Sequence, residues 1–428
     1  MWLSSRVLVT CVLILAGFSC QKTAHAQSAD SLAAARAAYA EGRYGTAIAY
    51  LGPYSAADAS ADALYLLGRS HQALLQHDAA LDALQQARQL DSLSVRTLRA
   101  LGQSYEALGR FASAESAYAR ALEITPSRRL HLRLAELYRK THEWKEATYH
   151  YRVLLRSDST NSLLHARIAQ SLQAQNRSAD ALRHFQQAHR LNPRHAAVAL
   201  PLSRLLEQQH QPTAALQVID STLHYRATAA LWKRRANLAF RQDSLRAARR
   251  AYERAIQQGD STASTFRRLG IAHVGSGQYA SALDALEQAR ARDSTNARTH
   301  FYLGVAYRGV DSLQQSAHAF EHAIDRVAGD VLIDAYMQSA VTYDERGQLD
   351  RAIAAYKTAL QIQPARVEIY FHLATLYDTY YRDKTTAALY YRKFLATADS
   401  LRTPFHTYAS NRLRTLRPVL HFQRGRTN

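Results

Sequence analysis

Residues 95–128 read VRTLRALGQSYEALGRFASAESAYARALEITPSR, and this stretch decides the fold of the 428-residue chain. Leu101 and Tyr105 belong to a helical pattern of apolar residues, Gly109 interrupts it, and Tyr118 lies in a second run that ends before a proline. Small residues between the large ones let the two predicted helices approach each other closely. Because a pair of this size cannot bury its apolar face alone, we expect it to stack on copies of itself.

The copies recur through most of the chain. A shift of about 34 residues finds the same order of large, small and aromatic residues again and again, in about eleven copies over residues 28–395. Residues 333–366 are as regular as 95–128, whereas 196–228 is the poorest copy. This recurrence resembles the tetratricopeptide repeat (TPR) family. The resemblance implies an all-α fold, a right-handed α-α superhelical solenoid of TPR helix hairpins with a C-terminal capping helix.

The repeats divide the chain into segments. The predicted order is a signal peptide at 1–26, repeats one to six at 27–228, repeats seven to eleven at 229–395, a capping helix at 396–417 and a basic tail at 418–428. Pro201 stands inside the first helix of repeat six, where a missing amide costs about 3 kcal/mol. Two interpretations stay open: repeat six is a kinked or shortened joint, or Pro201 lies in the first turn of a late-starting helix.

The N-terminus has the pattern of an export signal. Arg6 precedes an apolar run at 7–18, and a small-x-small cleavage site ends at Ala26. The run is shorter than the roughly 20 residues that span a bilayer. We therefore predict an exported, periplasmic protein, with lipidation of Cys20 and an outer-membrane lipoprotein as the alternative. Since Cys11 also lies in the leader, cleavage after Ala26 leaves no thiol in the mature chain.

The charge balance restricts the kind of partner. The net charge of +19 and the isoelectric point near 10.0 are strongly basic. Composition alone suggests nucleic acid, an anionic envelope surface or acidic proteins. Predicted export argues against nucleic acid, so we expect none.

The resemblance also indicates where a partner would bind. In TPR arrays the first helix of each repeat lines the concave wall of the superhelix. The basic residues predicted on this wall in repeats three to nine are Arg96, Arg99, Arg129, Arg139, Lys140, Arg167, Arg204, Lys233, Arg234, Arg241, Arg267, Arg298 and Arg308. The acidic residues predicted there in the last two repeats are Asp334, Asp344, Glu345, Glu368 and Asp378.

Two interpretations of the basic residues compete. Long charged side chains commonly do no more than solvate exposed helix faces. However, few carboxylates are interleaved with them in the sequence, which favours a binding surface over a neutral solvated one. Because the planar fork of arginine matches carboxylate and phosphate, an acidic peptide, an anionic polysaccharide or a membrane-surface headgroup would fit.

A more specific hypothesis concerns a peptide's terminal carboxylate. Some chaperone-binding TPR domains hold it with lysine and asparagine in one repeat, asparagine in the next, and lysine and arginine in a third. Lys233 and Asn237 match the first of these repeats, and Arg298 stands for the second lysine. Arg268 and Tyr302 depart from the pattern, so the resemblance to this clamp is weak.

Sequence signals of catalysis are lacking. We find no glycine-rich phosphate loop, nucleophile elbow or cysteine–histidine pairing. His318 and His322 share a helical spacing without a third ligand, which is typical of a solvated pair. The sequence therefore predicts no enzyme, cofactor or metal site. It predicts a protein–protein interaction scaffold of the cell envelope that binds an acidic partner segment, or alternatively a polysaccharide-export or envelope-assembly factor that guides an anionic glycan.

Overall fold

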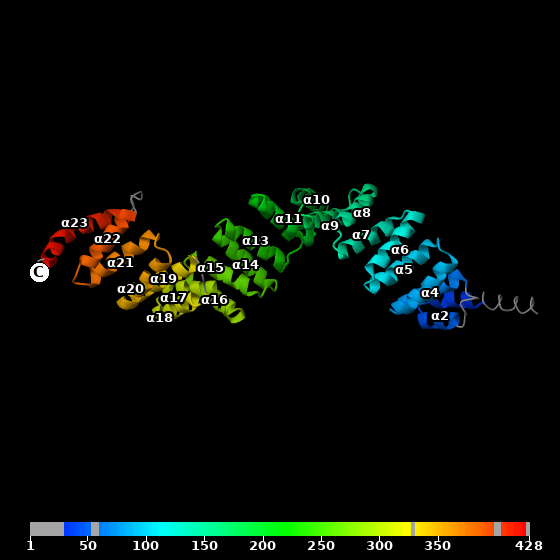
Figure 1. The fold of residues 1–428 in the computed structure, drawn as a ribbon, viewed down its shortest axis with the longest axis horizontal. Helices are drawn as coiled ribbons and strands as arrows, with labels where there is room; N and C mark the ends of the chain where they lie inside the picture. The colour runs from blue at the N-terminus through cyan, green and yellow to red at the C-terminus, as the bar shows by residue number, and fades with distance from the viewer. Residues whose placement is uncertain (1–29, 53–59, 327–329, 398–403, 425–428) are drawn as a thin grey trace, which may run out of the picture. The chain divides into compact units, whose positions relative to one another are not determined.

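The computed structural model describes residues 30–52, 60–326, 330–397 and 404–424, which are helical throughout and contain no strand (Figure 1). The chain divides into two compact units after Leu205. The first holds a helix at 30–40, α2 (Tyr44–Leu51), α3 (Ala61–Ala73), α4 (His77–Leu90), α5 (Val95–Ala107), α6 (Phe111–Ile124), α7 (Arg128–Lys140), α8 (Trp144–Ser157), α9 (Ser162–Ala174) and α10 (Ser178–Leu191). The division crosses α11 (Ala196–Gln208).

The second unit continues with the same kind of helix. Its members are α12 (Pro212–Tyr225), α13 (Ala229–Arg241), α14 (Leu245–Gln257), α15 (Ala263–Val274), α16 (Tyr279–Arg292), α17 (Ala297–Gly309), α18 (Leu313–Ile324), α19 (Asp330–Glu345), α20 (Leu349–Ile362), α21 (Val367–Tyr380), α22 (Thr385–Thr397) and α23 (Pro404–Arg424). Consecutive helices pair as hairpins, so repeat three is α5 with α6 and repeat seven is α13 with α14. The predicted all-α solenoid of helix hairpins is confirmed.

The stretch 95–128 folds as its sequence predicts. Gly109 ends the first helix of this hairpin in a left-handed conformation, at φ 71°, which costs a residue without a side chain little. Inside α5, a Cβ atom on Gly102 would overlap the ring of the fully buried Tyr118 on α6. Glycine in a helix interior costs about 1 kcal/mol relative to alanine, and here it allows the aromatic ring to lie against the helix backbone.

Stacking on the neighbouring repeat is also confirmed. Leu101 and Ala100 of α5 pack in one apolar cluster with Leu81 and Leu84 of α4. All four side chains are at most 3% exposed. At about 25 cal/mol per Å² of apolar surface removed from water, burial between neighbouring hairpins stabilises the array more than any surface ion pair does.

The structure decides part of the prediction for repeat six. Its first helix, α11, begins at Ala196 and ends at Gln208, so Pro201 lies beyond the first turn. The late-starting helix is therefore wrong, and so is a shortened one, because α11 has 13 residues, as do α9 and α13. The carbonyl of Ala197 has no amide at Pro201 to accept from, yet the flanking burial of Val198 and Leu202 keeps the helix continuous.

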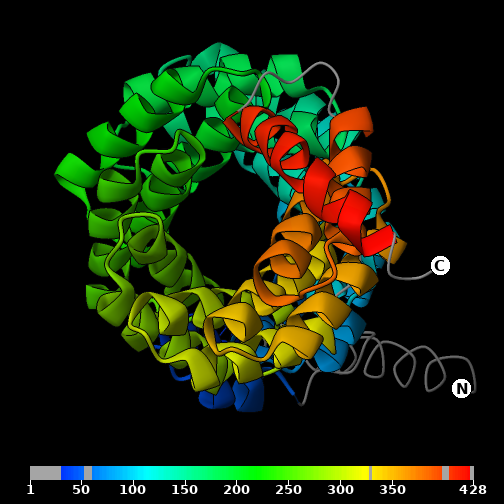
Figure 2. The ribbon, with the colours of Figure 1, turned by 90° about the vertical axis from the view of Figure 1, so that its left-hand side faces the viewer.

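The C-terminal helix packs on the last hairpin, as a capping helix should. It lies against α22 (Figure 2). Its Ala409 and Leu416 are buried with Phe394. Residues 398–403, the first part of the predicted capping segment, lie outside the described residues. The helix continues past Pro418 to Arg424, into the segment predicted as a basic tail. Among the described residues, no helix has the length and apolar character needed to cross a membrane.

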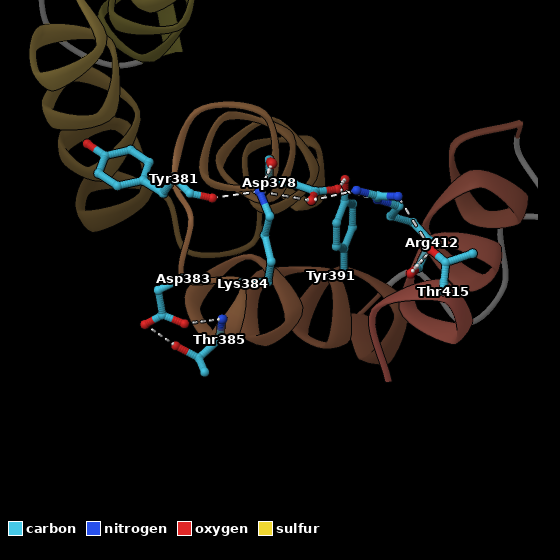
Figure 3. Close-up of polar contacts among 8 residues, drawn as sticks. All are labelled: Asp378, Tyr381, Asp383, Lys384, Thr385, Tyr391, Arg412 and Thr415. Atoms are coloured by element: carbon cyan, nitrogen blue, oxygen red, sulfur yellow. Dashed lines mark hydrogen bonds and ion pairs between the residues drawn. The ribbon is translucent and has the colours of Figure 1, made fainter. Parts of the chain in front are cut away.

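Asp378 ties this helix to the array. The side chain is only 5% exposed and lies between Lys384 and Arg412 (Figure 3). Arg412 of α23 donates two hydrogen bonds to it, from Nε at 2.6 Å and from Nη2 at 3.0 Å, and Tyr391 donates a third at 3.3 Å. A buried carboxylate held by a bidentate guanidinium is a strong contact. Asp378, predicted to be part of an acidic wall, is thus used inside the fold.

Candidate partner-binding surface

Carboxylates from the preceding repeat neutralise several of the predicted binding cations in the first unit. Arg96 pairs with Asp62 and lies 4.8 Å from the ring centroid of Tyr65. Lys140 Nζ lies 2.5 Å from Glu106 Oε1. Both acidic partners belong to the first helices of repeats two and three. The expectation that few carboxylates are interleaved is therefore wrong for this part of the surface.

Glu136 is the centre of a third neutralised group. Arg139 donates to its Oε2 at 2.8 Å, and Arg167 from the next repeat approaches its Oε1 at 3.5 Å. Tyr151 also donates to Oε1, at 2.7 Å. Burial alone would raise the pKa of Glu136, but the hydrogen bonds from Tyr151 and Arg139 and the charges of Arg167 and Arg139 lower it below its usual value. The carboxylate therefore stays charged and keeps both arginines occupied.

The predicted cations on the first helix of repeat seven, α13, also pair with carboxylates. Lys233 Nζ lies 3.0 Å from Asp260, while Arg234 and Arg241 reach the two oxygens of Glu207 at 2.8 and 3.0 Å.

Asn237, on the same helix, faces neighbours within the fold. Its Oδ1 accepts hydrogen bonds from Tyr252, at 2.7 Å, and from Arg268. Two positions of the proposed carboxylate clamp, Lys233 and Asn237, are thus engaged by the protein's own side chains.

A different arrangement occurs where α13, α15 and α17 meet. Arg241, Arg267, Arg268 and Arg298 line one pocket of about 560 Å³, here called the arginine pocket. Its remaining walls are partly apolar, from Phe240, Ile271, Ala297 and Val331, with Asn296 as a further polar residue. No acidic residue is among these lining residues.

Three of the four cations of the arginine pocket lack acidic partners among the described residues, whereas Arg241 pairs with Glu207. Among the described residues, Arg267, Arg268 and Arg298 form no ion pair. Burial lowers the pKa of Arg267 below its usual value; Asp293 opposes this shift, and the charges of Arg268 and Arg298 add to it. Asp293 itself accepts hydrogen bonds from Thr295 in its own turn, at 2.8 Å and 3.2 Å. An anion entering this pocket would therefore meet unsatisfied positive charge.

The remaining predicted residues lie outside the pocket. Arg129 and Arg204 are exposed and Arg99 is half-buried, and none of them has an acidic partner among the described residues. Arg308 is half-buried, with one guanidinium nitrogen that no described group hydrogen-bonds. On the predicted acidic wall, Asp334 pairs with Arg366 at 2.5 Å. Of the predicted cations, the structure brings Arg241, Arg267 and Arg298 together.

Two groups of basic residues were not predicted from the sequence as binding residues. Arg268 was seen only as a departure from the clamp pattern, although it lines the arginine pocket. Three exposed arginines of the second helix α14, at positions 246, 250 and 254, were not considered, because only first helices were expected to bind. Their spacing of four residues, which places them on one helix face, was the signal that could have found them.

Comparison with known proteins identifies the repeat. Models of the TPR repeat and of the tetratricopeptide repeat match residues 65–129, 99–162, 172–238, 267–332 and 342–378, together more than half of the chain. Among curated proteins, no significant match is found.

Several solved structures are similar to parts or most of the chain. YrrB, "a TPR protein with an unusual peptide-binding site", is 22% identical with a TM-score of 0.40, over 43% of this chain and 95% of that one. A chain of the APC/C hetero-tetramer Cut9–Hcn1 is 15% identical with a TM-score of 0.41, over 91% and 89%. Yeast Tom70 is 13% identical with a TM-score of 0.37, over 94% and 99%. On the repeat matches, the chain belongs to the tetratricopeptide repeat family, whose fold is that of a protein–protein interaction scaffold and whose members are in general not enzymes.

Proposed function

We propose that this protein is an exported scaffold of the cell envelope that holds an acidic segment of a partner protein in the arginine pocket. The observation that carries the proposal is the convergence of Arg241, Arg267, Arg268 and Arg298 in one pocket whose lining contains no acidic residue. Elsewhere on the first helices, cations such as Arg96 and Lys140 already have carboxylate partners. In repeats eight and nine, by contrast, three arginines without ion pairs among the described residues (Arg267, Arg268 and Arg298) line one pocket.

The chemistry of the pocket favours carboxylates beside apolar side chains. Guanidinium groups bind carboxylates through two parallel hydrogen bonds, which are stronger than bonds between neutral groups. Phe240 and Ile271 offer apolar surface next to them. A partner segment in which Asp or Glu alternates with leucine-like residues satisfies both parts of the wall.

Export is the second part of the proposal. Its support is the leader, with Arg6, the apolar run at 7–18 and the cleavage site at Ala26. Residues 1–29 lie outside the described structure. Mass spectrometry of the mature N-terminus distinguishes the two export routes: Gln27 as first residue indicates a signal peptidase product, a lipidated Cys20 indicates a lipoprotein, and an uncleaved chain contradicts export by this leader.

The binding proposal is tested with a labelled peptide of alternating Glu and Leu residues, against a matched peptide of Gln and Leu. We expect the acidic peptide to bind the full chain, and the affinity to fall as ionic strength rises from about 0.05 M to about 0.5 M, because salt screens exposed charge. The double variant Arg267→Glu/Arg298→Glu should weaken binding by about thirtyfold or more.

The matched control reverses two first-helix arginines outside the pocket. Arg129→Glu/Arg133→Glu changes the net charge by the same amount on exposed side chains of α7, which form no ion pair with any residue that the structure describes. We expect its affinity to stay within about threefold of the wild type. Equal losses of affinity in both double variants would show that only net charge matters. Equal affinities for the two peptides would contradict a preference for an acidic segment. Because Arg298 is exposed, Arg298→Glu alone gives a direct reading if the double variant is unstable.

A further inference from the structure

A second basic pocket lies on another side of repeat seven. It forms where α12, α13 and α14 meet and has a volume of about 600 Å³. Arg235, Arg250 and Arg254 provide its charge, and Trp232 provides an aromatic wall, with Asp220 as the acidic residue of the lining. We call it the α14 pocket.

The α14 pocket and the arginine pocket use opposite faces of α13. Trp232 lines the former and Arg241 the latter. These residues are nine positions apart, which is about two and a half turns of helix, so their side chains leave α13 in opposite directions. The two pockets are therefore separate sites, and a ligand in one leaves the other accessible.

The charge of the α14 pocket is largely uncompensated. Asp220 is already engaged, since Arg235 Nε lies 2.7 Å from its Oδ1. Glu253, the acidic residue of α14, pairs with Arg249 instead of the pocket residues.

Two guanidinium groups remain without acidic partners. Arg250 forms no ion pair among the described residues, and Arg254 donates only to the neutral amide of Gln257, at 3.3 Å. Both side chains are exposed, one helical turn apart. Arg246, one turn before them and also exposed, extends the same face.

We propose that the α14 pocket binds a phosphate monoester. One carboxylate would neutralise one of the two free guanidinium groups, whereas a phosphate monoester carries close to two negative charges and three acceptor oxygens. The planar fork of arginine matches these oxygens. Trp232 and the flanking alanines of α14 leave an apolar wall for the alcohol part of the ester. The ester can belong to a soluble sugar phosphate or to a lipid headgroup, and both present the same group to the two arginines.

Calorimetry on the full chain tests the site with three probes: inorganic phosphate, glucose 6-phosphate, and phosphatidylcholine vesicles with or without phosphatidic acid. We expect saturable binding of a phosphate monoester, weakened about tenfold or more by Arg250→Glu/Arg254→Glu. The variant Arg267→Glu/Arg298→Glu should bind the ester as the wild type does. Binding of glucose 6-phosphate supports a soluble sugar phosphate as the ligand. Binding only to vesicles with phosphatidic acid supports a lipid headgroup. In both cases the binding must be lost in Arg250→Glu/Arg254→Glu.

A matched control separates the pocket from net charge. Arg152 and Arg156 of α8 are exposed arginines with the same four-residue spacing on a second helix, and neither has an ion pair among the described residues. Arg152→Glu/Arg156→Glu should leave ester binding within about twofold of the wild type. Equal losses in the two double variants would overturn the proposal, as would the absence of binding to all phosphate probes. Displacement of the ester by the Glu-Leu peptide at equal concentration would also overturn it, since the pocket would then be a peptide site.

Discussion

The first helices of repeats three to five and those of repeats eight and nine both carry basic residues. The two regions differ in whether carboxylates pair with these residues. In the former, Arg96, Lys140 and Arg139 have carboxylates within ion-pair distance. In the latter, Arg267 and Arg298 have no ion pair among the described residues and line a pocket together. Both regions carry arginines, but in the second region the arginines without ion pairs share one pocket and can act together on one partner.

The difference arises from the residue one repeat earlier. Arg96, Lys140 and Arg241 follow an acidic residue by 34 positions, the length of one repeat, and each pairs with it. Arg268 instead meets the neutral amide of Asn237. The state of a surface cation in such an array therefore depends on its counterpart in the preceding repeat, and substitutions at Glu207, Asn237 and Asp62 test this rule.

The largest effect on stability is expected at Glu207, which forms ion pairs with two arginines. Glu207→Gln should lower the free energy of unfolding by about 3 kcal/mol, because the side chain of Arg234 is only 11% exposed and loses a charged partner. Chemical denaturation of the full chain measures this. Asp220→Asn is the control, since the carboxylate of Asp220 is 47% exposed, and it should cost less than about 1 kcal/mol. Similar costs for the two variants would contradict the role of burial.

Acid should weaken the first unit through His150. Burial, reinforced by the nearby His131, lowers the pKa of His150 to about 4, and the Nδ1 atoms of the two rings are 2.8 Å apart. An unfolded histidine takes up its proton near pH 6.5, so this contribution to stability is complete above that pH and is lost as the pH falls towards 4. The loss should reach about 2 kcal/mol by about pH 5.

Urea unfolding at about pH 7.5 and about pH 5 measures the acid effect. In His150→Gln the difference between the two pH values should shrink by most of that amount. His142→Asn is a suitable control, because His142 is exposed and asparagine tolerates its positive φ of 63°. An unchanged pH dependence in His150→Gln would contradict a titrating His150.

A smaller effect should follow from giving one arginine of the arginine pocket an acidic partner. Asn237→Asp supplies Arg268 with a carboxylate at the oxygen that already accepts its hydrogen bond. We expect the affinity for the acidic peptide to fall about fivefold to tenfold, because one of the free charges is lost. Fluorescence anisotropy measures this, and Asn237→Gln, which changes no charge, controls for altered packing. An affinity that rises in Asn237→Asp would contradict a pocket that binds by charge.

The smallest effect is expected at Asp62. Its carboxylate is 40% exposed and its partner Arg96 is 47% exposed, so Asp62→Asn should change the free energy of unfolding by less than about 0.5 kcal/mol. The variant leaves Arg96 without this partner, and we expect a modest gain in electrostatic attraction for the acidic peptide at low salt. A stability loss comparable to that of Glu207→Gln would show that exposed pairs also hold the repeats together.

The sequence predicts the hairpins because their information is local. The apolar spacing around Gly109 and the small residue at Gly102 are properties of one repeat, and α5 and α6 form where this spacing places them. Stacking follows because every copy has the same unsatisfied face. The two interpretations of Pro201 stayed open for a related reason: whether a helix tolerates proline depends on burial of its neighbours, which the residue itself does not show.

The binding surface is less predictable. The resemblance placed Arg241, Arg267 and Arg298 on one wall, but it could not tell them from Arg96 or Lys140. That distinction depends on the partner that each cation meets across the hairpins, as Glu207 shows with Arg234 and Arg241, and the wall prediction considered each cation without the residue one repeat earlier. The arginines of α14 were missed because their helix was assigned to packing alone, although helices in an array have outer faces as well.

The 34-residue spacing of these ion pairs has a consequence for how such a chain changes in evolution. Asp62 with Arg96, Glu106 with Lys140 and Glu207 with Arg241 join the same place in consecutive repeats, and Asp378 with Arg412 extends the rule to the capping helix. Tandem duplication of a whole repeat copies both ends of such a bond into register, whereas insertion of a single residue separates them. The array can therefore lengthen by recombination without new surface chemistry, provided that each added unit keeps the 34-residue spacing of these pairs.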